Sequence, residues 1–262
     1  MSSRSVTFAR ILTALFALII LLAVAASLSI DLSKFQERGS TREGQAILQG
    51  ISSPGEFESA LRLHPSNNVL QLMAKATGVV DSTKRAINQL SAQIEPARLS
   101  KEPNFASASP DELESFRRDL RTAEANASAF LPRYAALFKT EHDQIASATI
   151  SLHVPGEIAR QLLDGVTQRQ ARTLNAISQI LSARADYYRA YDNYIAFMTS
   201  QLGSFKNVAG QFVFPDQRSI ERYNAAAQAM TSAGRRVNEL ETAMKKQERP
   251  LPEEWIPLTG AN

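Results

Sequence analysis

The sequence contains no cysteine, which excludes a disulfide framework, a cysteine nucleophile and a lipid anchor attached through cysteine. Histidine is nearly as scarce. His64, His142 and His153 lie far apart, and none belongs to a His-x-x-x-His or Glu-x-x-His arrangement. Transition metals are usually held by several such ligands at short spacings. The sequence therefore predicts no metal site.

The motifs that mark common enzyme classes are also missing. There is no Gly-x-Ser-x-Gly turn, no Ser-x-x-Lys with its partner motifs, and no glycine-rich loop for nucleotide phosphates. A pair of carboxylates brought together by the fold remains open, since any two acids can meet in space. Without a cofactor motif or a catalytic constellation, we predict that the protein is not an enzyme and binds no cofactor.

The chain also lacks an excess of one charge beyond its first residues. Its net charge is +3 and its pI is about 9.2, but Arg4 and Arg10 precede the first acidic residue, Asp31. Beyond them the basic and acidic residues are almost equal in number and mixed along the chain. Nucleic-acid-binding proteins gather their basic residues on one face. We therefore predict no nucleic-acid partner.

Long apolar runs are absent except for one, from Ile11 to Ile30, which carries no charge. A helix of that length spans roughly 30 Å, the thickness of the bilayer core. Because Arg4 and Arg10 precede the run, the positive-inside rule places residues 1–10 in the cytoplasm. The alternative is a cleaved signal peptide, for which Ala23-Val24-Ala25 offers a site. We predict a single-pass signal-anchor at residues 11–30 that contacts the lipid bilayer of a bacterial inner membrane, with the bulk of the chain in the periplasm.

The remaining chain is patterned as helices. Residues 31–53 are predicted to form a juxtamembrane linker, and Pro54 opens a short helix that ends near His64. Ser66 is a candidate N-cap for a helix over 66–95, followed by an exposed loop up to Ser109. This helix is predicted from apolar residues that recur every three or four positions: Val69, Met73, Ala76, Val80, Ile87, Leu90 and Ile94.

Ser109-Pro110-Asp111-Glu112 is a strong helix start, and Pro132 should interrupt that helix near Phe130. A helical pattern then resumes up to about residue 152. The longest helix is predicted over 156–202, where a seam of apolar residues repeats every seven positions, with Arg184 as the polar exception. The seam consists of Leu174, Ile177, Leu181, Tyr188, Tyr191, Ile195, Met198 and Leu202. Such a seam needs a partner helix, either from this chain or from a second copy, so we predict a protein partner or a homodimer through residues 174–202.

A break over 203–215 is followed by a last helix over 216–247, with a second seven-residue repeat. That repeat consists of Tyr223, Met230, Val237 and Met244, with Ala226, Ala233 and Leu240 between them. Residues 249–262 form a proline-rich tail. The predicted fold is therefore all-α: an N-terminal transmembrane helix followed by an elongated antiparallel bundle of four to six helices over residues 54–248.

One segment carries a resemblance. Gly210, Phe214-Pro215 and Tyr223-Asn224, with Tyr194-Ile195-Ala196 before them, resemble part of an uncharacterised family of small all-helical envelope lipoproteins from enteric bacteria. The resemblance covers residues 190–230. It implies a helical domain tethered in the cell envelope, and it implies no activity or site residues. The family is anchored through a lipid-modified cysteine, whereas this chain offers a membrane helix.

Two groups of aromatic residues are candidates for ligand binding or protein interaction. Tyr187, Tyr191 and Tyr194 lie close to one helix face, with Tyr188 beside them, so their hydroxyls could line a pocket between helices. The other interpretation is that they pack in the core with their hydroxyls at its surface. Phe212 and Phe214, in the break, either cover the end of the bundle or project towards a lipid surface or a partner.

Trp255 in the tail is a further interaction candidate, either as an anchor that docks into another protein or as a residue that packs back on the bundle. Two functions fit all these features. The first is a membrane-tethered periplasmic scaffold or protein-interaction module of the bacterial cell envelope. The second is a small-ligand-binding bundle that resembles bacterial sensor domains and acts through a partner protein.

Overall fold

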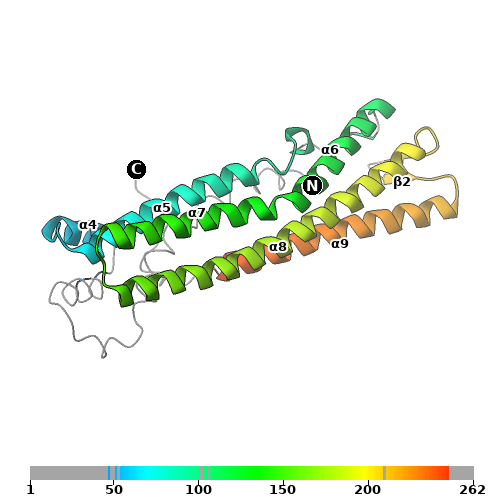
Figure 1. The fold of residues 1–262 in the computed structure, drawn as a ribbon. Helices are drawn as coiled ribbons and strands as arrows, with labels where there is room; N and C mark the ends of the chain where they lie inside the picture. The colour runs from blue at the N-terminus through cyan, green and yellow to red at the C-terminus, as the bar shows by residue number, and fades with distance from the viewer. Residues whose placement is uncertain are drawn as a thin grey trace. The chain divides into compact units, whose positions relative to one another are not determined.

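A computed structural model describes Ile47, Ile51 and residues 54–100, 103–105, 107–208 and 211–247. This part of the chain is mostly helical (Figure 1). Its α-helices are α4 (Pro54–Leu63), α5 (Asn68–Ser91), α6 (Pro110–Ala129), α7 (Leu131–Ser151), α8 (Gly156–Ser200) and α9 (Gln217–Gln247). The prediction of a mainly helical protein is thus confirmed.

The predicted membrane segment, residues 11–30, lies outside the described residues, as do most of the linker and the whole tail with Trp255. None of the helices among the described residues combines the length and the hydrophobicity that crossing a bilayer requires.

The helix boundaries follow local side-chain chemistry. Ser109 caps α6 in a capping box with Glu112, in which each side chain bonds the other residue's backbone amide. Helix α6 ends at Ala129, and α7 begins at Leu131 with Pro132 in its first turn, where the missing amide proton costs no hydrogen bond. The predicted interruption is therefore confirmed.

The predicted cap of α5 was wrong by one residue. Ser66 does not cap the helix, because the side-chain oxygen of Asn67 accepts hydrogen bonds from the amides of Val69 and Leu70, at 3.1 and 3.2 Å. Asparagine is as strong an N-cap as serine. The loop after α5 also contains a short 3₁₀ helix, η2 (Ala97–Ser100), which the sequence pattern did not indicate.

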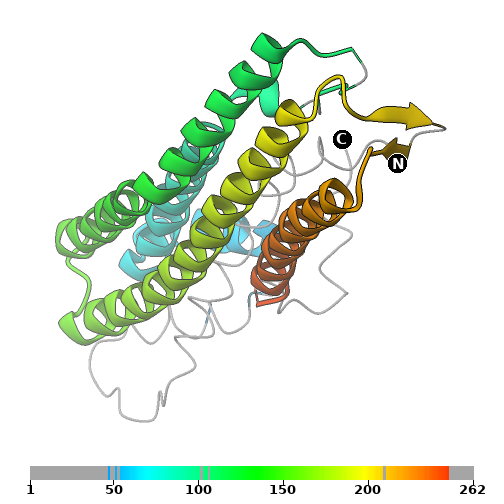
Figure 2. The same ribbon diagram turned by 90° about the vertical axis from the view of Figure 1, so that its right-hand side faces the viewer.

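The structure differs from the all-α prediction in one detail, the segment that follows α8. It forms an antiparallel hairpin of β1 (Lys206–Val208) and β2 (Gln211–Val213), in which Asn207 pairs with Phe212 (Figure 2). Because side chains alternate along a strand, Phe212 and Asn207 share one face of the hairpin. The two valines lie on the other face and are exposed, at 56% for Val208 and 51% for Val213.

The described residues divide into two compact units. Unit 1 comprises residues 89–134 and 174–244, and unit 2 comprises the described residues up to 88 together with 135–173 and 245–247. Helices α5, α7, α8 and α9 contribute residues to both units.

Unit 2 buries an apolar core together with a polar contact between α7 and α8. Its most deeply buried apolar side chains are Leu70, Leu72, Ile145 and Ile158. Glu141 of α7 is also buried, and its carboxylate accepts a hydrogen bond of 3.1 Å from Gln170 of α8. Gln170 donates a second hydrogen bond to the backbone oxygen of Phe138. This polar contact fixes the pairing of α7 and α8 within unit 2.

Unit 1 confirms the two seven-residue seams. In α8, the seam residues from Ile177 to Met198 are buried, while Leu174 and Leu202 at its ends are half-buried. In α9, Val237 is buried and the other predicted positions are half-buried. The two helices run side by side in Figures 1 and 2, and they approach closely where Gly234 of α9 faces the ring of Tyr187. A side chain at Gly234 would lie only 3.4 Å from that ring.

Candidate functional site

The candidate aromatic residues of unit 1 belong to one connected set of rings, here called the aromatic network. Neighbouring ring centroids in the network lie 5.1–6.5 Å apart. This is the range in which aromatic side chains attract one another. The network consists of Phe105, Phe116, Tyr187, Tyr188, Tyr191, Tyr194, Phe197, Phe205, Phe212, Phe214 and Tyr223. It unites the tyrosine group and the phenylalanine loop, which the sequence analysis treated separately.

The tyrosines pack among themselves and against other rings. Tyr191 contacts Tyr187, Tyr194 and the ring of Phe116, and it is 8% exposed, as is Tyr194. Tyr187 is half-buried. The structure therefore brings the three predicted tyrosines together on one side of α8, with their rings occupied in packing.

The hairpin covers one end of this network. Phe214 is buried and contacts Phe197 and Tyr223, whereas Phe212 is half-buried between Phe105 and Tyr223. Both phenylalanines named as candidates thus face the helices. The surface that the hairpin leaves exposed carries its valines instead.

The charged residues beside the tyrosines connect α8 to α6. Asp192 accepts a hydrogen bond of 2.8 Å from Arg117, and this bond raises the pKa of the Arg117 guanidinium. Arg189 lies 2.7 Å from Glu124 and 3.1 Å from Asp186. The Arg117–Asp192 and Arg189–Glu124 pairs connect α6 to α8, whereas Asp186 pairs with Arg189 within α8.

Arg184, the polar exception in the α8 seam, forms an ion pair with Glu241 of α9 at 2.7 Å. Both side chains are nearly buried. Burial opposes the charge of Arg184, but Tyr188 and the carboxylates of Glu241 and Glu95 outweigh it and raise the pKa of Arg184. Because the pair joins α8 to α9 at one position, it fixes their register.

Tyr188 is the most buried ring of the tyrosine group, and its hydroxyl donates a hydrogen bond to Glu95. Burial, followed by the negative charge of Glu95, raises the pKa of Tyr188 well above its ordinary value near 10. The folded protein therefore favours the un-ionised hydroxyl of Tyr188. Its contribution to stability is complete below pH ~10, and it is lost as the pH rises further.

We therefore expect the free energy of unfolding of the Tyr188→Phe variant to depend less steeply on pH in the alkaline range than that of the wild type. The wild-type free energy of unfolding should fall above pH ~10, and the variant's curve should be flatter by up to about 1.4 kcal/mol per pH unit. Urea unfolding followed by circular dichroism at neutral and alkaline pH measures this difference. Identical slopes for the two proteins would contradict the burial of an un-ionised Tyr188.

A groove runs along the exposed side of the α8–α9 pair in unit 1. It consists of two adjoining depressions of about 460 Å³ each, which share Asp186. Small side chains line much of it: Ser178, Ser182, Ala183, Ala190, Ala225, Ala226, Ala229 and Ala233. We call this feature the α8–α9 groove.

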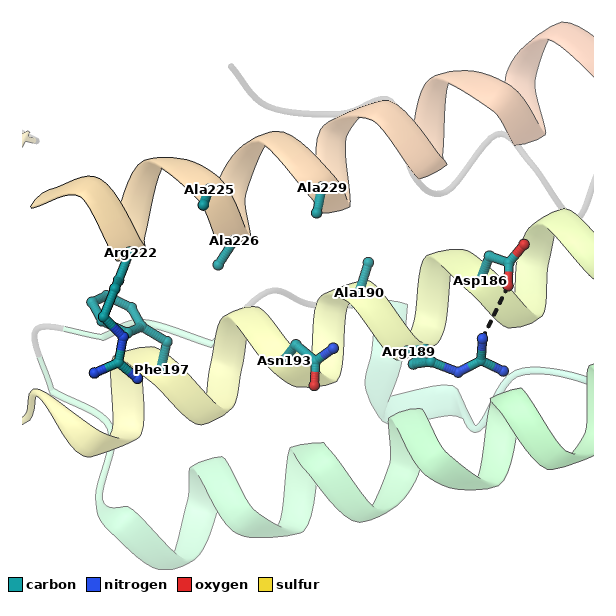
Figure 3. Close-up of a pocket in the computed structure, with 9 residues that line it drawn as sticks. All are labelled: Asp186, Arg189, Ala190, Asn193, Phe197, Arg222, Ala225, Ala226 and Ala229. Carbon is teal, nitrogen blue, oxygen red and sulfur yellow. Dashed lines mark hydrogen bonds and ion pairs between the residues drawn. The ribbon is translucent and has the colours of Figure 1, made fainter. Parts of the chain in front are cut away.

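Figure 3 shows one of the two depressions. The three alanines of α9 point towards α8, and Arg222 lies across the ring of Phe197, with its guanidinium carbon 5.4 Å from the ring centre. Asp186 and Arg189 form their ion pair at the opposite end. The depression is thus apolar along its floor and charged at its ends.

The sequence analysis assigned Ala226, Ala233 and Leu240 to the α9 seam but did not identify the other α9 residues of this groove. Arg222, Ala229 and Arg236 are spaced seven residues apart, next to the predicted seam positions, and this repeat is the signal that could have identified them. It also missed Phe105, which contacts Tyr194 from a loop that has no periodic pattern.

Metal chemistry has no visible basis in the described part of the chain. No group of three or more histidine, aspartate or glutamate side chains there comes together in a way that could hold a metal ion. His142 lies 3.7 Å from Asp143, its neighbour in sequence. The absence of an enzymatic function stays a prediction.

No family model, no curated protein and no solved structure matches this chain.

Proposed function

We propose that this protein is a membrane-tethered helical scaffold or protein-interaction module of the bacterial cell envelope. Residues 11–30 would anchor it in the inner membrane, with the remaining chain in the periplasm. The apolar run and the two arginines before it support this placement. The resemblance of residues 190–230 to helical envelope lipoproteins supports the same setting.

The observation that carries the proposal is the packing of the aromatic network. Tyr191 and Tyr194 are buried against other rings, and the charges beside them, Arg189 and Asp192, are used in ion pairs between helices. A small-ligand site usually leaves a few polar groups directed into an enclosed pocket. Unit 1 instead uses these groups to hold its helices together, which favours a structural role.

The partner of such a scaffold would contact the exposed side of helix α8 within residues 174–202. The seam on the other side is already covered, since Leu181, Ile195 and Met198 are buried within the single chain. A second copy would have to use the same exposed side. This arrangement leaves both a protein partner and a homodimer compatible with the proposal.

The alternative function, a module that binds a small ligand, is favoured by the depression shown in Figure 3. Its ends offer Asp186, Arg189, Asn193 and Arg222 around an apolar floor. A small amphipathic molecule would find both kinds of contact there. In this case the protein would transmit its bound state through a partner.

Native mass spectrometry of the full chain, released from detergent micelles, distinguishes the two functions. The scaffold proposal predicts a ligand-free dimer, a higher oligomer or a complex with another protein. A monomer that carries a reproducible small-molecule adduct would contradict it and support the ligand-binding module.

The Tyr187→Ala variant sharpens this test. Tyr187 is half-buried and packs against Tyr188 and Tyr191, so its loss should cost about 1–2 kcal/mol of stability and leave the assembly unchanged. The mass of the assembly and the melting temperature of the variant measure both effects. A folded, correctly assembled variant that has lost its function would overturn the pure scaffold proposal.

A further inference from the structure

We propose that the aromatic network has an activity of its own: its tyrosines take up one-electron oxidising equivalents from small radicals and pass them to Tyr188, where Glu95 accepts the proton. The substrates are one-electron oxidants such as the hydroxyl and carbonate radicals. All the residues involved belong to unit 1. The inference goes beyond the scaffold function and does not depend on it or on the anchor.

The first argument is the continuity of the tyrosine rings. Five of the six tyrosines of the chain follow one another in the network, in the order Tyr223, Tyr194, Tyr191, Tyr187 and Tyr188. Successive ring centroids lie 5.9, 6.4, 5.8 and 5.6 Å apart, so neighbouring rings are nearly in contact. Phenols are oxidised far more readily than phenylalanine rings, and electrons move easily over such short separations. These tyrosines therefore form one continuous chain of oxidisable groups.

The second argument is the proton acceptor at one end of this chain. A phenol that loses an electron becomes a strong acid, so its oxidation proceeds where a base can take the proton. The hydroxyl of Tyr188 already donates a hydrogen bond to the carboxylate of Glu95, which is the contact that proton transfer requires. Glu95 is exposed and can release the proton to water, whereas Tyr188 is only 2% exposed. A radical on Tyr188 is thus kept away from other molecules.

The third argument is composition. The chain contains no cysteine, a residue that is readily oxidised, so its tyrosines have no thiol to compete with. Packing alone does not require tyrosine at these positions, because phenylalanine fills nearly the same space and carries no hydroxyl that needs a hydrogen bond. Tyr191 and Tyr194 are nonetheless tyrosines at 8% exposure, and both lie on the path from Tyr223 to Tyr188.

The reaction is a coupled transfer of one electron and one proton. The oxidant gains one electron and is reduced, Tyr188 becomes a neutral tyrosyl radical, and its hydroxyl proton moves to Glu95. A half-buried tyrosine that meets the oxidant first, such as Tyr223, loses an electron and a proton. It regains the electron from the next ring and the proton from water, so the net loss is that of Tyr188. A small thiol then returns one electron to Tyr188, and Glu95 returns the proton.

The test oxidises the full chain, kept in detergent, with light-excited ruthenium tris-bipyridine and persulfate. Electron paramagnetic resonance follows the product and distinguishes tyrosyl from tryptophanyl radicals. In the wild type we expect a tyrosyl signal that persists after the light is switched off. Tyr188→Phe keeps the ring but removes the hydroxyl, and it should lose most of this signal. Glu95→Gln keeps the shape of the side chain but removes the negative charge that attracts the proton, and it should lose the signal as well.

Tyr134→Phe is the matched control. Tyr134 is buried like Tyr188, and its hydroxyl shares a hydrogen bond of 2.8 Å with Ser91, but it is the one tyrosine that does not belong to the network. Its replacement should leave the persistent signal unchanged. The melting temperatures of all variants show whether a loss of signal comes from a folding defect.

Tyr191→Phe tests the path between the rings. The ring stays in place, but the chain of phenols is interrupted between Tyr194 and Tyr187. Peptide mass spectrometry after illumination should then find more oxidation of Tyr223 than in the wild type, and the persistent signal should become weaker.

Three results would overturn the inference. The first is a wild type without a persistent tyrosyl signal. The second is a signal that survives Tyr188→Phe, or that Tyr134→Phe reduces to the same extent. The third is a distribution of oxidation products that Tyr191→Phe leaves unchanged, because the rings would then be oxidised independently. None of these results concerns the mass of the assembly, so the scaffold proposal would stand or fall separately.

Discussion

The Glu241→Ala variant is expected to lose about 3–5 kcal/mol of its free energy of unfolding. The carboxylate of Glu241 lies 2.7 Å from the guanidinium of Arg184, and the two side chains are only 9% and 13% exposed. Removing the acid leaves the arginine in a site where burial opposes its charge. A charged group without its partner in such a site costs several kcal/mol, much more than an exposed pair contributes.

Urea unfolding followed by circular dichroism measures this loss, and two further variants show its cause. Glu239→Ala removes an exposed acid two residues earlier in α9 and should change stability by less than about 0.5 kcal/mol. The double variant Arg184→Met with Glu241→Leu replaces the pair by apolar side chains and should recover most of the loss or exceed the wild type. Equal effects for the Glu239 and Glu241 variants would show that the pair is open to water.

The helices of this protein could be predicted because the sequence patterns that mark them are local. Ser109 and Glu112 stand three residues apart in the chain and form the capping box of α6 within one turn. The seam of α8 repeats every seven residues, and its buried positions, such as Ile177 and Ile195, depend only on helical periodicity. Such features need no knowledge of which helix lies beside which.

The features that were missed depend on contacts between distant parts of the chain. Arg184 disrupts a local pattern, and only its pairing with Glu241, 57 residues later, explains it. The hairpin after α8 is two strands of three residues each, too short for an alternating pattern to stand out. The α8–α9 groove depends on the register between two helices, which the hairpin and the ion pair together determine.

The other large effect is expected for Ile195→Asp, which should lose more than about 4 kcal/mol of stability. Ile195 is one of the α8 seam residues and is fully buried. The substitution removes apolar contacts and places an ionisable group where the seam offers apolar neighbours such as Met198. If the protein is a scaffold, its assembly should disappear together with the fold, whereas Tyr187→Ala leaves both intact.

Asn193→Asp is the matched control. It introduces the same side chain two residues earlier in α8, at an exposed position that borders the α8–α9 groove. Its effect on the free energy of unfolding should stay within about 0.5 kcal/mol. Comparable losses in the two variants would show that added negative charge on α8, rather than burial, destabilises the protein.

The pH dependence of the Ile195→Asp variant identifies the origin of its loss. Burial disfavours the charged carboxylate, so the pKa of the new aspartate should be higher in the folded protein than its ordinary value near 3.9. The ionisation penalty is then complete above the folded-state pKa and shrinks as the pH falls towards the unfolded-state pKa. The difference in stability between variant and wild type should therefore narrow on acidification and level off at the cost of the lost apolar contacts. A difference that does not change with pH would mean that the carboxylate has reached water, which requires the α8 seam to open around residue 195.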